Sequence, residues 1–125
     1  MTIPFATQDS HPYQNGPTWS RLEKAVARTA FDAALKRELH EVMQEAKRMA
    51  NQINEPADLW DLEHFLNQRR KEIDRKYDYR YSRLTQVLGR LLYEGRVSEE
   101  ELSGLREDKL KLIRSFVEFL AKDAA

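Results

Sequence analysis

The stretch from Asp58 to Arg83 restricts the possible folds of this chain more than any other part of the sequence. It begins with an amphipathic pattern and becomes a run of charges with tyrosines among them, and between Asn67 and Arg83 the only aliphatic residue is Ile73. No glycine or proline interrupts the stretch, so the sequence predicts one helix through it. A helix this polar needs ion pairs or a partner helix for stability. The stretch therefore favours a binding surface over a catalytic pocket.

Length and charge limit the class of protein. The chain has 125 residues, enough for one domain, and its 21 basic residues balance 21 acidic ones. No net field therefore attracts nucleic acid or a membrane surface. Cysteine is absent, which excludes disulfides and thiolate chemistry. No apolar run approaches the roughly 20 residues that span a bilayer, and the first residues lack the pattern of a signal peptide. We expect a soluble, cytoplasmic protein without membrane insertion.

The chain divides into a polar start and one helical domain. Residues 1–17 hold three of the four prolines, so a flexible tail is predicted there, and 18–125 form the domain. Helices are expected over about 19–54, 57–94, 98–104 and 107–122. Ser20 with Glu23, and Ser98 with Glu101, have the spacing of capping boxes. Gly95 is a natural helix end.

The two long helices set the predicted fold class. Apolar residues recur every three or four positions along the first helix, and the short linker before Pro56 favours an antiparallel hairpin. We predict an all-α protein in which two long antiparallel helices form a dimerising stalk and short helices form a small head. No β-strand is expected, since apolar and polar residues do not alternate with the period of two that strands show. The apolar seams need a partner, most simply a second copy. The seam of the second helix comprises Leu59, Leu62, Leu66, Ile73 and Tyr77.

The sequence contains only weak matches to catalytic and metal-binding motifs. His40 and Glu41 resemble half of a zinc-protease motif, but Gln44 stands where the second histidine is needed. The scattered glycines form no phosphate loop, and no nucleophile motif occurs. The sequence therefore predicts no enzyme, no metal and no cofactor. The bases and tyrosines between Arg69 and Arg83 leave nucleic-acid binding as a minor alternative, and we expect a salt-bridged helix surface there instead.

Trp60 is the most informative single residue. On a helix it shares a face with polar side chains beside the leucine seam, a composition typical of an interface hot spot. The alternative is that Trp60 caps the core of the hairpin. The predicted partner or dimer interface comprises Trp60, Glu63, His64, Asn67, Arg70 and Asp74.

Three groups of residues at fixed spacing resemble one known family. The first group is Trp19-Ser20, Glu23, Ala30-Phe31, Ala34 and Arg37-Glu38. The central group is Leu59-Trp60, Leu62, Phe65-Leu66, Arg70, Glu72-Ile73-Asp74, Lys76-Tyr77-Asp78, Arg80 and Ser82. The last group is Gly95, Glu101-Leu102, Leu105 and Asp108-Lys109. With these residues the chain resembles the fluorescence recovery protein family over about residues 19–113.

This resemblance implies a function. Members of the family are homodimers that bind the photoactivated orange carotenoid protein, chiefly its C-terminal domain, speed its return to the resting form and so end the quenching of phycobilisome fluorescence. Two departures support an alternative, a dimeric helical scaffold or adaptor with another protein partner. The family typically reads Leu-His-Asp-Phe-Leu where this chain has Glu63 and His64 in the middle positions, and often has phenylalanine where this chain has Gln86.

Overall fold

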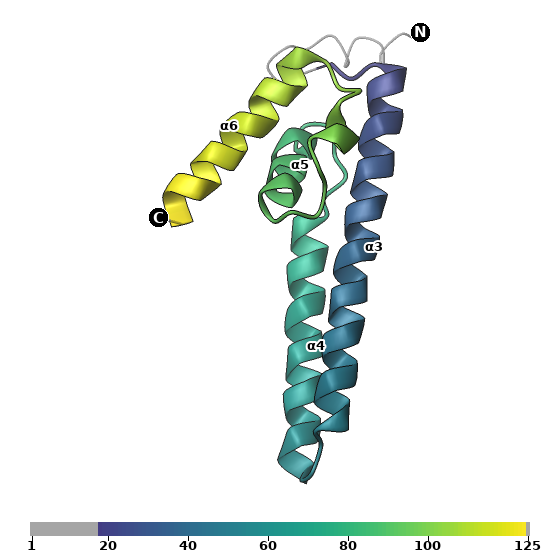
Figure 1. Cartoon of the computed structure of the whole chain (residues 1–125), viewed down its shortest axis with the longest axis vertical. Helices are drawn as coiled ribbons and strands as arrows, with labels where there is room; N and C mark the ends of the chain where they lie inside the picture. Colours follow the sequence, from purple (N-terminus) through teal and green to yellow (C-terminus); the bar gives the residue numbers. More distant parts are fainter. Residues whose placement is uncertain (1–17, 125) are drawn as a thin grey trace, which may run out of the picture.

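The computed structural model describes residues 18–124, which are helical throughout apart from their connections (Figure 1). The elements are α3 (Arg21–Asn51), α4 (Pro56–Lys76), α5 (Leu84–Tyr93), the 3-10 helix η1 (Glu100–Leu102) and α6 (Glu107–Ala124). The predicted all-α class is confirmed for this part of the chain. The tail predicted over residues 1–17 lies outside the described residues.

Helix α3 begins with the predicted capping box. The Ser20 hydroxyl accepts the backbone N–H of Glu23 at 3.2 Å, and the Glu23 carboxylate accepts the backbone N–H of Ser20 at 3.1 Å. One face of the helix is buried, and half of its members are alanines, which let the other elements approach closely. This face comprises Glu23, Ala27, Ala30, Phe31, Ala34 and Glu38.

Helix α4 lies beside α3 and runs antiparallel to it (Figure 1). The connection is closed by Asp58, whose carboxylate accepts the backbone N–H groups of Asn54 at 2.9 Å and Glu55 at 3.1 Å. Pro56 occupies the first turn, where its missing N–H has no helical partner to lose. The hairpin is therefore held by local hydrogen bonds at its tip.

The prediction of one long helix over 57–94 is wrong. Helix α4 ends at Lys76, and α5 begins only at Leu84. Backbone N–H groups of Asp78 and Arg80 bond to carbonyls two residues earlier, as in inverse γ-turns. The sequence alternates here, with tyrosine at 77, 79 and 81. These rings pack against α3, since Tyr79 and Tyr77 lie edge-on to Phe31 at centroid distances of 4.8 Å and 5.3 Å. Packing of the Tyr77 and Tyr79 rings on Phe31 of α3 thus outweighs helix propensity and redirects the chain.

Helix α5 ends just before Gly95, the residue at which the sequence predicted a helix end. Gly95 has a φ of 76°, and the N–H groups of Gly95 and Arg96 bond to Leu92 and Leu91, the pattern of a Schellman motif. Beyond it, Ser98 and Glu101 form their predicted reciprocal hydrogen bonds. The single turn of η1, which contains Glu101, stands in place of the helix expected over 98–104.

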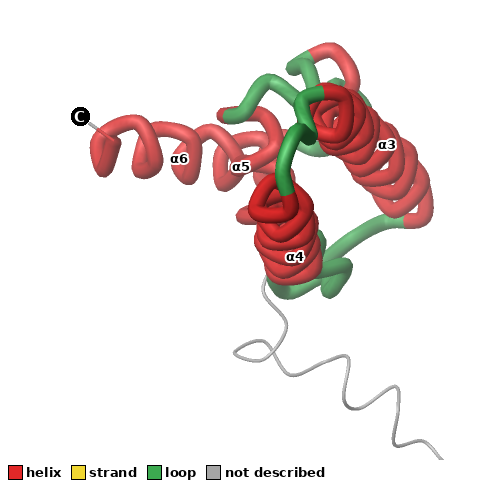
Figure 2. The backbone as a smooth tube through the Cα atoms, turned by 90° about the horizontal axis from the view of Figure 1, so that it is seen from below, coloured by secondary structure: helices red, strands yellow, loops and turns green. Residues whose placement is uncertain are grey.

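The core lies at one end of the hairpin. It gathers the start of α3, the connection after α4, α5, η1 and the first half of α6. Beyond Glu38 no residue of α3 is fully buried, and α4 contributes only Ile73. Figure 2 shows α6 extending away from the α3–α4 pair. The far half of the hairpin and one side of α6 therefore leave apolar side chains exposed in a single chain.

Candidate protein-binding surface

The face predicted around Trp60 is exposed along α4. The Trp60 side chain is 64% exposed, so it does not pack into a core formed by the described residues. This removes the alternative in which Trp60 caps the hairpin core of a single chain. The other five members of the predicted interface are exposed as well, and they are Glu63, His64, Asn67, Arg70 and Asp74. We call the six residues the Trp60 face.

The charges of the Trp60 face are less paired than the sequence suggested. Arg70 has Asp74 four residues on and Glu63 seven back, but no ion pair of Arg70 is present among residues 18–124. The pairs formed within the stretch from Arg69 to Arg83 are Arg69 with Glu72 at 2.6 Å and Arg80 with Asp78 at 2.5 Å, and its other pairs join Arg69 and Lys76 to acids outside the stretch. The salt-bridged surface expected from the spacing is therefore only partly formed, and Arg70 is accessible to a partner.

The predicted seam residues fall into two groups. Leu59 and Leu66 are exposed and Leu62 is half-buried, so this part of α4 still presents apolar surface. Ile73 is buried, and Tyr77 packs against the core from the connection that follows α4. The structure therefore separates an exposed apolar strip from residues that hold the single chain together.

A buried carboxylate that the sequence analysis did not single out organises the centre of the molecule. Glu38 is fully buried, and four side chains converge on its carboxylate. Arg69, Lys76 and the Tyr77 hydroxyl each donate a hydrogen bond at 2.8 Å, and Arg96 forms an ion pair at 3.1 Å. Glu38 follows Ala34 by four residues and thus extends the small-residue face of α3, which is the signal that could have revealed it. It also explains Arg69, which stands where the seam of α4 would have an apolar residue.

The protonation states of this network follow from its contacts. Burial alone would raise the pKa of Glu38, but hydrogen bonds from Lys76, Tyr77 and Arg69 outweigh it and lower that pKa. Burial and the hydrogen bond to Glu38 raise the pKa of Tyr77. Glu38 is therefore an anion at neutral pH, with its charge compensated from α4 and from the segment after α5.

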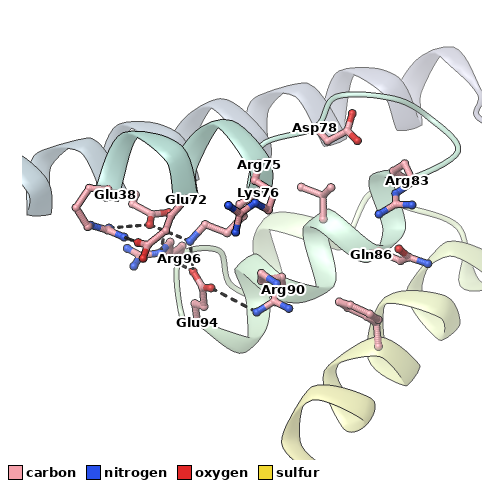
Figure 3. A pocket seen from close by; sticks show the side chains of 13 residues that line it. Glu38, Glu72, Arg75, Lys76, Asp78, Arg83, Gln86, Arg90, Glu94 and Arg96 are labelled. Carbon is pink, nitrogen blue, oxygen red and sulfur yellow. Dashed lines mark hydrogen bonds and ion pairs between the residues drawn. The ribbon is translucent and has the colours of Figure 1, made fainter. Parts of the chain in front are cut away.

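Beside this network lies a cavity of about 570 Å³ between the end of α4, α5 and α6 (Figure 3). Its basic lining residues are Arg69, Arg75, Lys76, Arg83, Arg90 and Arg96. Figure 3 shows the Glu38 network at one end of the cavity and Arg83 with Gln86 at the other. We call this cavity the arginine pocket. The sequence analysis named Gln86 but did not place these arginines together, because they come from separate elements.

The half zinc-protease motif occupies an exposed turn of α3. The ring of His40 lies 3.5 Å from the amide nitrogen of Gln44, and neither side chain is buried. Within 18–124, no group of three or more metal-binding side chains comes together. None of the helices in this range is long and apolar enough to cross a membrane.

An exposed tryptophan beside an arginine that has no ion pair within residues 18–124 is the composition of a protein-binding surface. Residues 19–117 match the family of the photoprotection regulator fluorescence recovery protein. The fluorescence recovery protein of Synechocystis sp. (strain ATCC 27184 / PCC 6803 / Kazusa) is 41% identical over 97 residues, which are 78% of this chain and 89% of that protein.

Solved structures from the same family are also similar to this chain. The fluorescence recovery protein of Fremyella diplosiphon is 44% identical with a TM-score of 0.77, and the match covers 81% of this chain and 99% of that one. The fluorescence recovery protein of Synechocystis sp PCC 6803 is 40% identical with the same TM-score and the same coverage. The chain belongs to the fluorescence recovery protein family, a family of regulators, and the resemblance seen in the sequence is confirmed.

Proposed function

We propose that this protein binds the photoactivated orange carotenoid protein, chiefly through that protein's C-terminal domain, and accelerates its return to the resting form. This would end the quenching of phycobilisome fluorescence. The observation that carries the proposal is the Trp60 face, where a large aromatic side chain is exposed beside Arg70, which has no ion pair within the part of the chain that the structure describes. Tryptophan and arginine are the residues most enriched among interface hot spots.

We further propose that the protein acts as a homodimer in the cytoplasm. Exposed apolar side chains follow the hairpin on both helices, and they are Leu39, Met43, Leu59 and Leu66. A second copy of the same hairpin is the simplest surface that would cover them, because a two-fold axis pairs each strip with itself. The Trp60 face adjoins this strip on α4, so dimer and partner surfaces would lie side by side.

The direct test is dark recovery of the orange carotenoid protein after illumination, followed by absorption. Substoichiometric amounts of this protein should shorten the recovery time, and Trp60→Ala should abolish most of the effect. His40→Ala is a matched control, since it also changes an exposed ring but lies on α3. Unchanged recovery in excess protein would leave the family fold without this activity.

A second candidate is a dimeric helical adaptor for another protein. It is favoured by the order Glu63-His64, which turns the acid by about 100° around the helix relative to the family pattern, and by Gln86. Capture of a different protein from the source cell on immobilised wild type, lost with Trp60→Ala, would support this candidate. Capture that Trp60→Ala leaves intact would assign it to another surface.

A further inference from the structure

The arginine pocket holds more cationic charge than its own acids compensate. Four carboxylates line it with the six bases, and each of the four is already paired. The pairs are Glu38 with Arg69, Lys76 and Arg96, Glu72 with Arg69, Glu94 with Lys76 and Arg96, and Asp78 with Arg80. Within the described residues Arg75 and Arg83 form no ion pair, and Arg90 reaches Glu94 only at 4.0 Å. Three guanidinium groups therefore face one cavity with little compensation.

The three arginines with little compensation are positioned by two helices, α4 and α5. Arg83 and Arg90 are seven residues apart at the start and end of α5, so they lie on one face about 10 Å apart, with Gln86 and Val87 between them. Arg75 comes from the last turn of α4 across the cavity (Figure 3). The spacing suits several carboxylates presented along a short segment better than one compact anion.

An apolar edge borders the same cavity. Phe116 of α6 lines the pocket, and its ring stacks on the ring of Phe119 with a centroid distance of 5.8 Å. The Phe119 side chain is mostly exposed. Gly89 permits this arrangement, because a Cβ there would lie only 3.1 Å from the Phe116 side chain. Two phenylalanine rings thus form an uncovered apolar shelf next to the arginines.

We propose that the arginine pocket and the Phe116–Phe119 shelf together bind an acidic segment of a partner protein that also carries an apolar side chain. Guanidinium groups bind carboxylates through paired, charge-assisted hydrogen bonds, and the shelf offers burial for an apolar neighbour. A polyphosphate backbone fits less well, because Glu72, Asp78 and Glu94 line the same cavity and the whole chain has no net charge.

This site is separate from the Trp60 face. Arg75 and Trp60 are fifteen residues apart on the same helix, which corresponds to about 22 Å along its axis. The inference therefore goes beyond the proposed function and does not depend on it, since it concerns the chemistry of a bound segment whichever protein supplies it. A partner that engaged both surfaces would be bound at two points, which raises affinity through effective concentration.

The test is a titration of the full chain, labelled with nitrogen-15, by a blocked peptide of six glutamates around a central phenylalanine. Amide resonances of residues 83–90 and around 116 should shift and saturate, while those around Trp60 should not. The same peptide with glutamine in place of glutamate should bind at least tenfold more weakly. Shifts spread evenly over the chain, or none at α5, would overturn the proposal.

Charge reversal completes the test. Arg75→Glu/Arg83→Glu should weaken peptide binding at least tenfold, and circular dichroism should show a wild-type fold because neither side chain has an ion pair to lose among residues 18–124. Arg21→Glu/Lys111→Glu changes the charge equally at exposed positions outside the pocket and should leave binding within twofold. Equal losses in both variants would mean that net charge alone drives binding, which contradicts a defined site. If orange carotenoid protein recovery fails while the peptide binds, only the proposed function is lost.

Discussion

The Lys109 ammonium lies 3.1 Å from the Glu23 carboxylate, and both side chains are only 1% exposed. Lys109 belongs to the first turn of α6 and Glu23 to the first turn of α3, so the pair ties together two elements far apart in the sequence. The same carboxylate accepts the backbone N–H of Arg106 at 2.9 Å and that of Ser20 at 3.1 Å. Glu23 is thus both the capping residue of α3 and the anchor for the start of α6.

Removal of the buried cation should be costly. We expect Lys109→Met to lower the free energy of unfolding by about 3–5 kcal/mol, because Glu23 is left as an uncompensated buried charge. The double variant Glu23→Gln/Lys109→Met should lose less than the sum of the single variants. Urea denaturation measures both, and Lys111→Met on the exposed side of α6 should change stability by no more than about 0.5 kcal/mol.

The free energy of unfolding should also fall as the pH is lowered. Burial opposes ionisation of Glu23, but the N–H groups of Arg106 and Ser20 together with Lys109 lower its pKa from 4.5 to about 2. The hydrogen bond from Arg37 lowers the pKa of Glu101 to about 2. Both groups are more acidic folded than unfolded, so their contribution is complete above about pH 5 and is lost as the pH falls toward 2.

Denaturation at fixed protein concentration, repeated between pH 7 and pH 2.5, measures this dependence. Glu101→Gln should flatten the slope of stability against pH, since one ionisation is removed from the folded state. A free energy of unfolding that is the same at pH 3 and pH 7 would contradict the assignment.

Gly104 is required by a close approach to α3. A Cβ at this position would lie 2.6 Å from a methyl group of Val26, so Gly104→Ala should destabilise the fold by about 1–3 kcal/mol. In the Val26→Ala background the same substitution should cost much less. Gly95→Ala is the matched control, because its cost comes from the positive φ and should not change with Val26→Ala. A double-mutant cycle by thermal or urea unfolding measures the coupling, and zero coupling between Gly104 and Val26 would reject this account.

Substitution by aspartate should have different effects at two residues of the predicted α4 seam, Leu66 and Ile73. Leu66 is 41% exposed and Ile73 is 9% exposed in the single chain. We expect Leu66→Asp to leave the helical content near wild type but to shift sedimentation toward the monomer, whereas Ile73→Asp should unfold the chain through burial of an unpaired charge. A Leu66→Asp variant that stays dimeric at low micromolar concentration would place the dimer interface elsewhere.

The Trp60 face should respond at the level of binding and not of folding. Trp60→Ala should weaken the complex with the photoactivated orange carotenoid protein by about 2 kcal/mol, or roughly thirtyfold in Kd, as truncation of a hot spot does. Arg70→Leu should weaken the same complex, because this guanidinium has no ion pair with any described residue and is exposed to the partner. Calorimetry measures both, and sedimentation of each variant shows whether the dimer is altered. Wild-type affinity in both variants would reduce the Trp60 face to a solvated helix surface.

Several features of the fold follow from short-range rules and were predictable. The Ser20–Glu23 capping box, the helix end at Gly95 and the start of α4 at Pro56 depend on contacts within a few residues, so the local sequence contains the information. That the members of the Trp60 face share one side of the helix was predictable too, since they repeat at helical spacing, but the exposure of Trp60 came only from the structure. The break between Lys76 and Leu84 was missed because no glycine or proline marks it, although the alternation of tyrosines at 77, 79 and 81 was visible.

The sequence by itself determined the class, the first helix, the helix-ending residues and which side chains share a face of α4, because these depend on period, propensity and capping. Only the tertiary structure decided where the second helix ends and which charges remain uncompensated. Tyr79 leaves the helix because Phe31, 48 positions earlier, offers its ring an edge-on contact. Glu38 is buried because Arg69, Lys76, Tyr77 and Arg96 converge on it. Contacts between distant residues carry these energies, so the local pattern alone does not decide them.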